Sequence, residues 1–318
     1  MLMTAVAATS FGQTKRMAVT ALSENMMRAE PDYESALETQ SLMGTIVEIV
    51  GEEGYWRQVV TPEQLNEYKA APKYICIAFH SAVYSGPSVK SERLSDLSMG
   101  NLLRVAFTEG KKVGPSVVKG WAEVILPDGR NGWTQANDLE RFETWAQKPK
   151  PSEAGIIATA RQFIGTPYLW GGASSKGLDC SGLVRLTWFM NGYLLPRNAS
   201  QQVFLGREII VNADHSIGKD NVSLYDEMVK RIKNLKPGDL VFFGSPETRW
   251  KKESITHVGI YIGNGEIIHA SHKVRINSLI PGTKNYYENA HRLLKARRLF
   301  DWKGEGLVPI SQSKAYNL

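Results

Sequence analysis

Short apolar runs dominate the chain from residue 24 to residue 145, and no long helical period occurs there. These runs, which turn residues separate, predict β-strands. They are Gly44–Val50, Tyr55–Val60, Tyr74–Phe79, Asn101–Phe107 and Gly120–Leu126. Strands this short and closely spaced favour small barrels over one large sheet. The runs form two groups in an imperfect repeat, because Leu42–Thr45 is similar to Met99–Leu102 and each opens a strand.

Helical patterns begin after residue 151. Ser152 and Glu153 can start a first helix, in which apolar residues recur at helical spacing. A second helical period begins near Cys180, with apolar side chains along one side as far as Met190. Gly192 is suited to end this second helix.

Three apolar strands are predicted in the last third of the chain, at residues 240–244, 257–262 and 266–271. The polar stretch 207–235 reads as a surface insertion, and the basic segment around His291 reads as helical. A helix followed by a run of antiparallel strands describes an α+β domain.

Four segments are therefore expected along the chain. They are an N-terminal segment at 1–23, a first barrel at 24–80, a second barrel at 81–147 and the α+β domain at 148–318, with Pro149–Pro151 as a stiff linker. The N-terminal segment starts with small and apolar residues, like a secretory signal that lacks its basic start. No stretch reaches the roughly 18–20 apolar residues that a membrane span needs. We expect a periplasmic or otherwise exported protein without a transmembrane segment, with a cytoplasmic protein as the alternative.

Composition narrows the choice of partners. The chain is 42% hydrophobic and 22% charged, as in an ordinary globular protein, and its net charge is +6. That charge suits an anionic neighbourhood such as cell-wall polymer or a membrane surface. Lys and Arg are not interleaved with aromatic residues and zinc-finger spacing is absent, so no nucleic-acid partner is expected.

Only two cysteines occur, Cys76 and Cys180, so the chain has no disulfide framework. Cys76 lies in an apolar run and is expected to be a core residue. Cys180 follows a loop rich in glycine and serine and falls in the first turn of the predicted helix. Backbone N–H groups and the helix dipole favour an anion there, so we expect a lowered thiol pKa and a reactive cysteine.

A reactive thiol needs a base, and the base needs a partner that orients it. If Gly263–Gly265 forms a three-residue hairpin loop, His257 and His269 fall on one face of the hairpin, with His269 opposite Gly259. A two-residue turn at Asn264 and Gly265 would instead separate the two histidines. Two half-exposed histidines that align by chance remain an alternative. A metal site of Cys180, His257 and His269 is another alternative, although no fourth ligand lies at a spacing typical of zinc sites.

The ordered motifs of residues 155–275 resemble the NlpC family of cysteine peptidases. They include Gly165-x-Pro-Tyr-x-Trp-Gly-Gly, Asp179-Cys-Ser-Gly, Leu195-Pro-Arg, Pro237-Gly-Asp, His257-Val-Gly and Ile268-His-Ala. The resemblance implies a papain-like α+β core. It also implies Cys180 as the nucleophile, His257 as the base and His269 as the residue that orients the base, with no cofactor.

The strands before this region resemble bacterial SH3-like domains, more closely in the second group than in the first. With these domains, the whole chain resembles the γ-D-glutamyl-L-diamino acid endopeptidases, which cut murein peptides with a free N-terminal L-Ala. The resemblance implies that Asp179 and Ser181 help to hold the substrate. It further implies a pocket lined by Tyr168, Trp170 and Ser200 and closed by Glu30 and Tyr68 of the first barrel.

The resemblance thus implies a cysteine endopeptidase that trims murein peptides for cell-wall recycling, and we expect a monomer. One alternative is a hydrolase of intact murein, with the SH3-like domains as wall anchors. The other is a wall-binding protein without catalysis, which is disfavoured because all three catalytic positions are filled. A carboxylate at Asp179 can form a charge-assisted contact with an ammonium, or it can cap the helix, and both roles can hold.

Overall fold

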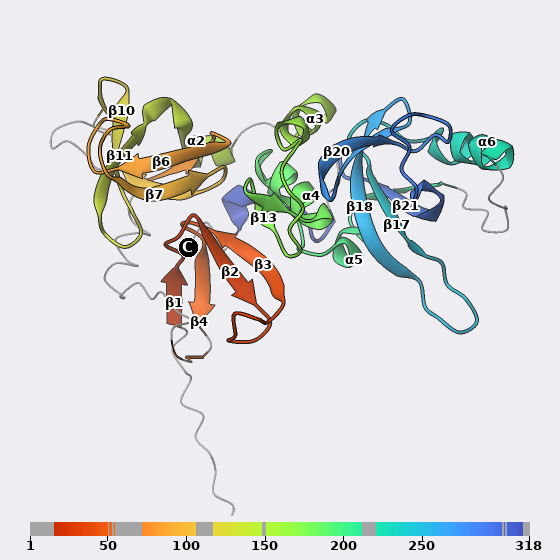
Figure 1. The fold of residues 1–318 in the computed structure, drawn as a ribbon, viewed down its shortest axis with the longest axis horizontal. Helices are drawn as coiled ribbons and strands as arrows, with labels where there is room; N and C mark the ends of the chain where they lie inside the picture. The colour runs from red at the N-terminus through yellow and green to blue at the C-terminus, as the bar shows by residue number, and fades with distance from the viewer. Residues whose placement is uncertain are drawn as a thin grey trace, which may run out of the picture.

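The computed structural model places an all-β region before an α+β domain, as the strand and helix patterns predict (Figure 1). The described residues are 16–49, 51–52, 54, 72–105, 117–147, 151–211, 221–300, 302 and 304–313. The strand predicted at Tyr55–Val60 lies outside these residues, as does most of the predicted linker.

The first β unit consists of two strand pairs. β1 (Arg16–Val19) pairs with β4 (Ile46–Ile49), and β2 (Glu24–Arg28) pairs with β3 (Leu37–Leu42). Since β1 is the partner of β4, this unit includes residues that precede the boundary predicted at residue 23. The small apolar stretch that suggested a leader therefore ends before β1 begins.

The second β unit is one sheet with the strand order β12-β5-β8-β10-β11-β6-β7, and β9 pairs with β10. Its strands are β5 (Lys73–Cys76), β6 (His80–Tyr84), β7 (Arg93–Ser98), β8 (Leu102–Val105), β9 (Val117–Val118), β10 (Trp121–Ile125), β11 (Asn131–Gln135) and β12 (Leu139–Arg141). Because β5 pairs with β8 and β12, this sheet includes a strand that precedes the boundary predicted at residue 80. Cys76 lies in the core of this sheet with no exposed surface, as predicted.

The predicted repeat of the two β units corresponds to two equivalent turns. Gly44 joins β3 to β4 and Gly100 joins β7 to β8, and their φ angles are 83° and 92°. Glycine is favoured at such left-handed positions because it has no Cβ. The backbone N–H of Leu102 donates to the carbonyl of Met43, so the two turns also lie against each other.

The helices of the α+β domain follow the second β unit. They are α2 (Phe142–Ala146), α3 (Glu153–Gln162), α4 (Cys180–Phe189), α5 (Ala199–Gln202) and α6 (Asn221–Ile232), with 3-10 turns at Ala290–Arg292 and Ile310–Gln312. A further 3-10 turn, Ala136–Asp138, joins β11 to β12 in the second β unit. Ser152 caps α3, since its side chain accepts a hydrogen bond from the backbone N–H of Gly155 at 3.0 Å. Two short pairs flank α4, namely β13 (Ala173–Ser174) with β14 (Gly177–Leu178) and β15 (Tyr193–Leu194) with β22 (Val308–Pro309).

Six antiparallel strands form the main sheet of this domain, in the order β16-β21-β17-β18-β19-β20. They are β16 (Arg207–Ile209), β17 (Leu240–Ser245), β18 (Ser254–Gly263), β19 (Glu266–Ser271), β20 (Lys273–Ser278) and β21 (Leu293–Arg298). His291 lies in a short 3-10 turn, Ala290–Arg292, and the residues that follow form strand β21, so the predicted helix is limited to this turn. The stretch 207–235 also contributes more than a surface insertion, because β16 joins the sheet and Met228 of α6 is fully buried.

The sheet separates two apolar cores, because successive side chains of a strand point to opposite faces and so enter different cores. One face buries Val258, Ile260 and Ile268 against α4. The other face buries Tyr261 and Ile267 in the cluster that contains Met228. In Figure 1, α4 stands beside the sheet near β18, and α6 lies at its far end.

The hairpin of β18 and β19 differs from the predicted three-residue loop. Its turn has two residues, Asn264 and Gly265, with φ angles of 52° and 78°, as a type I′ turn requires. A one-residue bulge at Ile262 offsets the shorter turn, so Ile260 still pairs with Ile268. The predicted loop is wrong, but the register that depended on it is correct.

In the part of the chain that the structure describes, none of the helices has the length and apolar character needed to cross a membrane.

Candidate active site

Cys180 is the first residue of α4, and the residue before it caps the helix. The Asp179 carboxylate accepts a hydrogen bond from the backbone N–H of Gly182 at 2.7 Å, as an N-cap does. Gly182 is needed for close approach, because a Cβ there would collide with the carbonyl oxygen of Gly172. The loop of residues 171–179, here called the junction loop, is therefore folded tightly onto the start of α4.

The Asp179 carboxylate accepts hydrogen bonds from five donors. Two are the backbone N–H groups of Gly182 and Gly171, the latter at 3.0 Å, and a third is the Ser181 hydroxyl at 3.1 Å. The other two come from the Arg197 guanidinium, which binds both carboxylate oxygens, at 3.0 and 2.5 Å. A carboxylate has about four lone-pair positions, so this one has no acceptor capacity left for a substrate ammonium. The geometry favours a positioning role for Asp179.

Cys180 lies against β18, in reach of the backbone N–H of Val258, the residue that follows His257. Burial and then the charge of Asp179 raise the pKa of the Cys180 thiol to about 11, and the N–H groups of Val258 and Ser181 only partly oppose this. The pKa lowering expected at a helix start is therefore wrong in direction, because the thiol is buried as well as placed at a helix terminus.

His257 and His269 are in hydrogen-bond contact, as the predicted register requires. Nε2 of His257 lies 2.8 Å from Nδ1 of His269, and Nε2 of His269 lies 2.9 Å from Oδ1 of Asn277. Nδ2 of Asn277 in turn donates to the carbonyl of Asn285 at 2.6 Å. These residues form a relay that runs from β18 through β19 and β20 to the loop that follows.

The relay has one consistent arrangement of protons, set by its last member. A backbone carbonyl only accepts, so the amide nitrogen of Asn277 faces Asn285 and its oxygen faces His269. His269 then carries its proton on Nε2 and accepts at Nδ1 from Nε2–H of His257. Nδ1 of His257 is left with a free lone pair, which is the form that a general base needs.

Burial keeps both imidazoles neutral. Burial first, and the neighbouring His269 second, lower the pKa of His257 to about 3. Burial likewise lowers the pKa of His269 to about 4, although the bond to Asn277 opposes the shift. With the Cys180 pKa at about 11, the resting site holds a thiol and a neutral imidazole rather than an ion pair.

These pKa values predict how alkylation of Cys180 depends on pH. The raised pKa means less thiolate than an ordinary cysteine has, so the rate with iodoacetamide should rise about tenfold per pH unit from pH 7 to 9. The rate is measured by mass spectrometry of the peptide that contains Cys180, which separates it from Cys76. A plateau across this range would indicate a preformed thiolate–imidazolium pair and contradict the neutral resting state.

The structure brings some of the sequence-predicted pocket residues to the thiol and leaves others at the surface. Burial raises the pKa of Tyr168 to about 12, and Cys180 and Asp179 add to the shift, so its phenol is near both and stays protonated. Trp170 is 69% exposed, and Ser200 is exposed in α5, which packs beside β18. Glu30 is exposed in the turn between β2 and β3, and its backbone bonds to Ser35 within that turn. Tyr68 lies outside the described residues.

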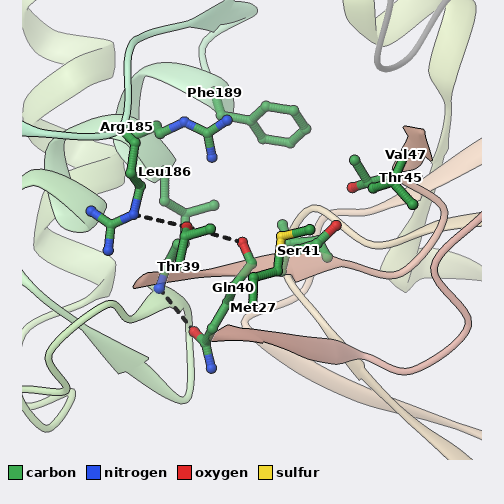
Figure 2. A pocket seen from close by; sticks show the side chains of 12 residues that line it. Met27, Thr39, Gln40, Ser41, Thr45, Val47, Arg185, Leu186 and Phe189 are labelled. Atoms are coloured by element: carbon green, nitrogen blue, oxygen red, sulfur yellow. Dashed lines mark hydrogen bonds between the residues drawn. The ribbon is translucent and has the colours of Figure 1, made fainter. Parts of the chain in front are cut away.

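The first β unit reaches the site through residues of β3 instead. Oγ1 of Thr39 accepts a hydrogen bond from Nε of Arg197 at 2.8 Å, and Oε1 of Gln40 accepts one from the backbone N–H of Ala173 at 2.8 Å (Figure 2). The guanidinium that holds Asp179 is thus fixed from the first β unit. A cavity of about 170 Å³ lies between β3 and the C-terminal half of α4, where Leu186 and Phe189 line it (Figure 2).

Lys176 connects the junction loop with both β units. Its Nζ donates to Glu24 at 2.7 Å in the first unit and to Asp96 at 3.0 Å in the second. The hydroxyl of Ser175 also donates to the carbonyl of Phe79 at 2.7 Å. The loop that leads to Cys180 is therefore held from both sides by the N-terminal region.

Two positioning residues and one aromatic neighbour of the site were not predicted from the sequence. Arg197 stands in the Leu-Pro-Arg motif, but its bond to Asp179 depends on the tertiary fold. Asn277 lies two residues after Arg275, which pairs with His269, so extending the strand parity to β20 would have placed it on the same face. The Tyr287 ring lies 5.8 Å from that of His257 and 4.6 Å from that of His269 between centroids, and no local pattern indicates this.

Within the described residues, no group of three or more His, Cys, Asp or Glu side chains is arranged to hold a metal ion. The ligand set of Cys180, His257 and His269 that the sequence left open is thus not assembled as a metal site. The two imidazoles bond to each other through their ring nitrogens, which leaves His269 no free nitrogen.

Residues 165–294, which include Cys180, His257, His269 and Asn277, match the family model of the NlpC/P60 family. The chain carries an NlpC/P60 domain. Since this is a family of cysteine peptidases, the protein is a cysteine peptidase, in agreement with the motifs that suggested one.

Curated relatives extend the similarity beyond the NlpC/P60 domain. The γ-D-glutamyl-L-lysine dipeptidyl-peptidase of Bacillus cereus (strain ATCC 10987 / NRS 248) is 27% identical over 276 residues, which cover 79% of this chain and 73% of that protein. The enzyme of the same name from Bacillus subtilis (strain 168) is 26% identical over 284 residues, covering 84% and 82%. Dipeptidyl-peptidase 6 of Lysinibacillus sphaericus is 27% identical over 273 residues, covering 79% and 87%.

A solved structure shares the fold over most of its length. The crystal structure of an NlpC/P60 family protein from Bacillus cereus ATCC 10987 has a TM-score of 0.65 and 21% sequence identity, and the match covers 89% of this chain and 99% of that chain. The shared fold therefore includes the N-terminal β region as well as the NlpC/P60 domain.

Proposed function

We propose that this protein is a γ-D-glutamyl-L-diamino acid endopeptidase that releases L-Ala-γ-D-Glu from murein peptides with a free N-terminal L-Ala. The names of the two Bacillus relatives support this activity, and their alignments extend well beyond residues 165–294. The observation that carries the proposal is the contact of β3 with the start of α4, through Thr39 and Arg197. A β unit in this position limits how far the acyl part of a substrate can extend past Cys180. Substrates with longer acyl parts are therefore excluded.

In this proposal Cys180 is the nucleophile. Nδ1 of His257 takes the thiol proton as sulfur attacks the γ-carbonyl carbon of D-Glu, and a tetrahedral thiohemiacetal-type anion forms. His257 then gives the proton to the nitrogen of the diamino acid as the C–N bond breaks, which leaves a thioester on Cys180. A water that His257 deprotonates hydrolyses this thioester, releases the dipeptide and restores the thiol.

Other groups stabilise the charges that develop in these steps. The developing imidazolium of His257 is held in place by His269, which Asn277 fixes in the accepting tautomer. The Tyr168 phenol, kept protonated by its raised pKa of about 12, is suited to donate to the oxyanion. Asp179 acts through the helix start, because Arg197 and two backbone N–H groups hold its carboxylate.

The remaining parts of the proposal concern the N-terminal region and the setting. We assign its strands to two SH3-like barrels, of which the first closes the acyl side of the site and the second braces the junction loop at Lys176. An exported or periplasmic protein with a net charge of +6 would meet anionic wall polymer and the peptides released from it. Recycling of those peptides is the proposed role.

A comparison of free and N-acetylated substrates tests the proposal. We expect kcat/KM for L-Ala-γ-D-Glu-L-Lys to exceed that for its N-acetyl form by at least about tenfold, because losing one charge-assisted contact costs about 1.5–3 kcal/mol. The L-Ala nitrogen is acylated in intact murein, so equal cleavage of both peptides would favour a hydrolase of the intact wall. Cleavage of neither would contradict the proposed activity.

Variants of the acidic turn between β2 and β3 identify the side chain that binds the free amine of the substrate. The five donors on Asp179 leave Glu30 as the acidic side chain proposed for this contact, so Glu30→Gln should reduce the preference for the free amine. Glu34→Gln is the matched control, since both residues are exposed in the same turn. Equal preference in the two variants would exclude Glu30 from amine recognition.

A further inference from the structure

A second pocket adjoins the relay on the side of β20. Its volume is about 590 Å³, and its walls come from the end of β19, from β20 and from the loop before the 3-10 turn at Ala290. Asn277 and Tyr287 belong both to this pocket and to the surroundings of the two histidines. A ligand in this pocket would therefore contact Asn277 and Tyr287, which in turn contact the histidines.

Arg275 is the most informative residue of the pocket wall. It pairs with His269 across β19 and β20, so the two side chains are neighbours on one face. Its guanidinium reaches the Ser271 hydroxyl only at 3.5 Å, and its Nε is buried without a hydrogen-bond partner. Among residues 16–313 that the structure describes, no carboxylate lies within ion-pair distance of Arg275.

The other charges around the pocket suit a ligand that carries an anionic group and, next to it, a cationic group. Lys284 is exposed on the wall and adds a second positive charge, while Glu288 is exposed on the rim. A guanidinium with unused donors forms two parallel hydrogen bonds to a carboxylate, and a buried donor left unpaired is costly. The pocket is thus prepared for a carboxylate at Arg275.

We propose that this pocket receives the leaving diamino acid and that Arg275 binds its α-carboxylate. This inference rests on the proposed function, in which the bond that breaks joins the γ-carbonyl of D-Glu to the diamino acid nitrogen. The α-carbon next to that nitrogen bears the carboxylate, so the carboxylate lies close to the proton that His257 delivers. The acyl half of the substrate lies toward the first β unit and the leaving half lies toward β20. The preferred substrate is then a peptide that ends at the diamino acid.

The test compares L-Ala-γ-D-Glu-L-Lys with its C-terminal carboxamide. The wild-type enzyme should cleave the free carboxylate with a kcat/KM about 30-fold higher, the value of one hydrogen-bonded charge pair. Arg275→Gln should lower kcat/KM about 30-fold for the carboxylate, chiefly through KM, and leave the carboxamide within about twofold. Arg275→Lys should restore part of the preference for the free carboxylate, since lysine retains the positive charge but cannot form two parallel hydrogen bonds.

Arg275 also lowers the pKa of His269, and the carboxamide substrate separates this effect from binding, because a changed relay would slow both peptides. Arg249→Gln is the matched control, since it removes one positive charge from the loop between β17 and β18. Equal cleavage of carboxylate and carboxamide by the wild-type enzyme would overturn the inference and leave the proposed function intact. Cleavage of neither peptide would instead overturn the proposed function, and this inference with it.

Discussion

Replacing Cys180 with alanine is expected to lower kcat/KM for L-Ala-γ-D-Glu-L-Lys by about 10⁴-fold or more, as the loss of a nucleophile does in other hydrolases. The thiol is the first side chain of α4, and in the proposed mechanism its base is His257 of β18, the residue before Val258, whose backbone N–H reaches Cys180. Release of the dipeptide is followed by chromatography over hours, because the residual rate is slow. More than about one per cent of the wild-type kcat/KM in this variant would contradict the assignment of the nucleophile.

The second cysteine provides the matched control for this variant. Cys76 is fully buried in the second β unit, and burial raises its thiol pKa to about 12. Cys76→Ala removes a side chain of the same size, at a cost of about 1 kcal/mol in unfolding free energy. Its kcat per folded molecule should match the wild type. Equal losses in the two variants would trace the effect to folding rather than to the nucleophile.

The start of α4 was predictable because its signals are local. Glycine and serine before Cys180 predict a loop, and the helical period after it predicts the helix. The hairpin of β18 and β19 was predictable only in part. Alternation of apolar residues requires one register, but a three-residue loop and a two-residue turn with a bulge at Ile262 produce the same register. The sequence pattern therefore predicts that His257 and His269 meet on one face of the hairpin, but not the turn that brings them there.

Other parts of the site depend on contacts between distant segments. Arg197 is fixed by Thr39 of the first β unit and then occupies Asp179, and this contact changes the expected role of the carboxylate. The pKa of Cys180 is raised by burial, although its position in the chain suggested the reverse. Position in the sequence reports the helix start but not how much protein covers it.

Replacing Asn277 with leucine is expected to lower kcat about 100-fold, because a buried N–H group without an acceptor costs about 1–3 kcal/mol. Asn277 is 7% exposed, and its oxygen is the acceptor for Nε2–H of His269. Without that acceptor, His269 is free to carry its proton on Nδ1, where it no longer accepts from His257. The base would then be held in the wrong tautomer. Single-turnover kinetics measure the loss in kcat, and ¹⁵N chemical shifts of the imidazole rings report the tautomer.

Two further variants distinguish this positioning role from a general effect on stability. Asn277→Asp retains an acceptor toward His269, so its kcat should stay within about tenfold of the wild type. Its negative charge should raise the His269 pKa and move the acid limb of the pH profile to higher pH. Asn101→Leu makes the same change at a buried asparagine of the second β unit, whose side chain accepts from Ser98 and donates to Ser23. It should lower Tm but leave kcat and the imidazole shifts unchanged. If Asn277→Leu behaves like Asn101→Leu, the relay ends at His269 and Asn277 is only a packing residue.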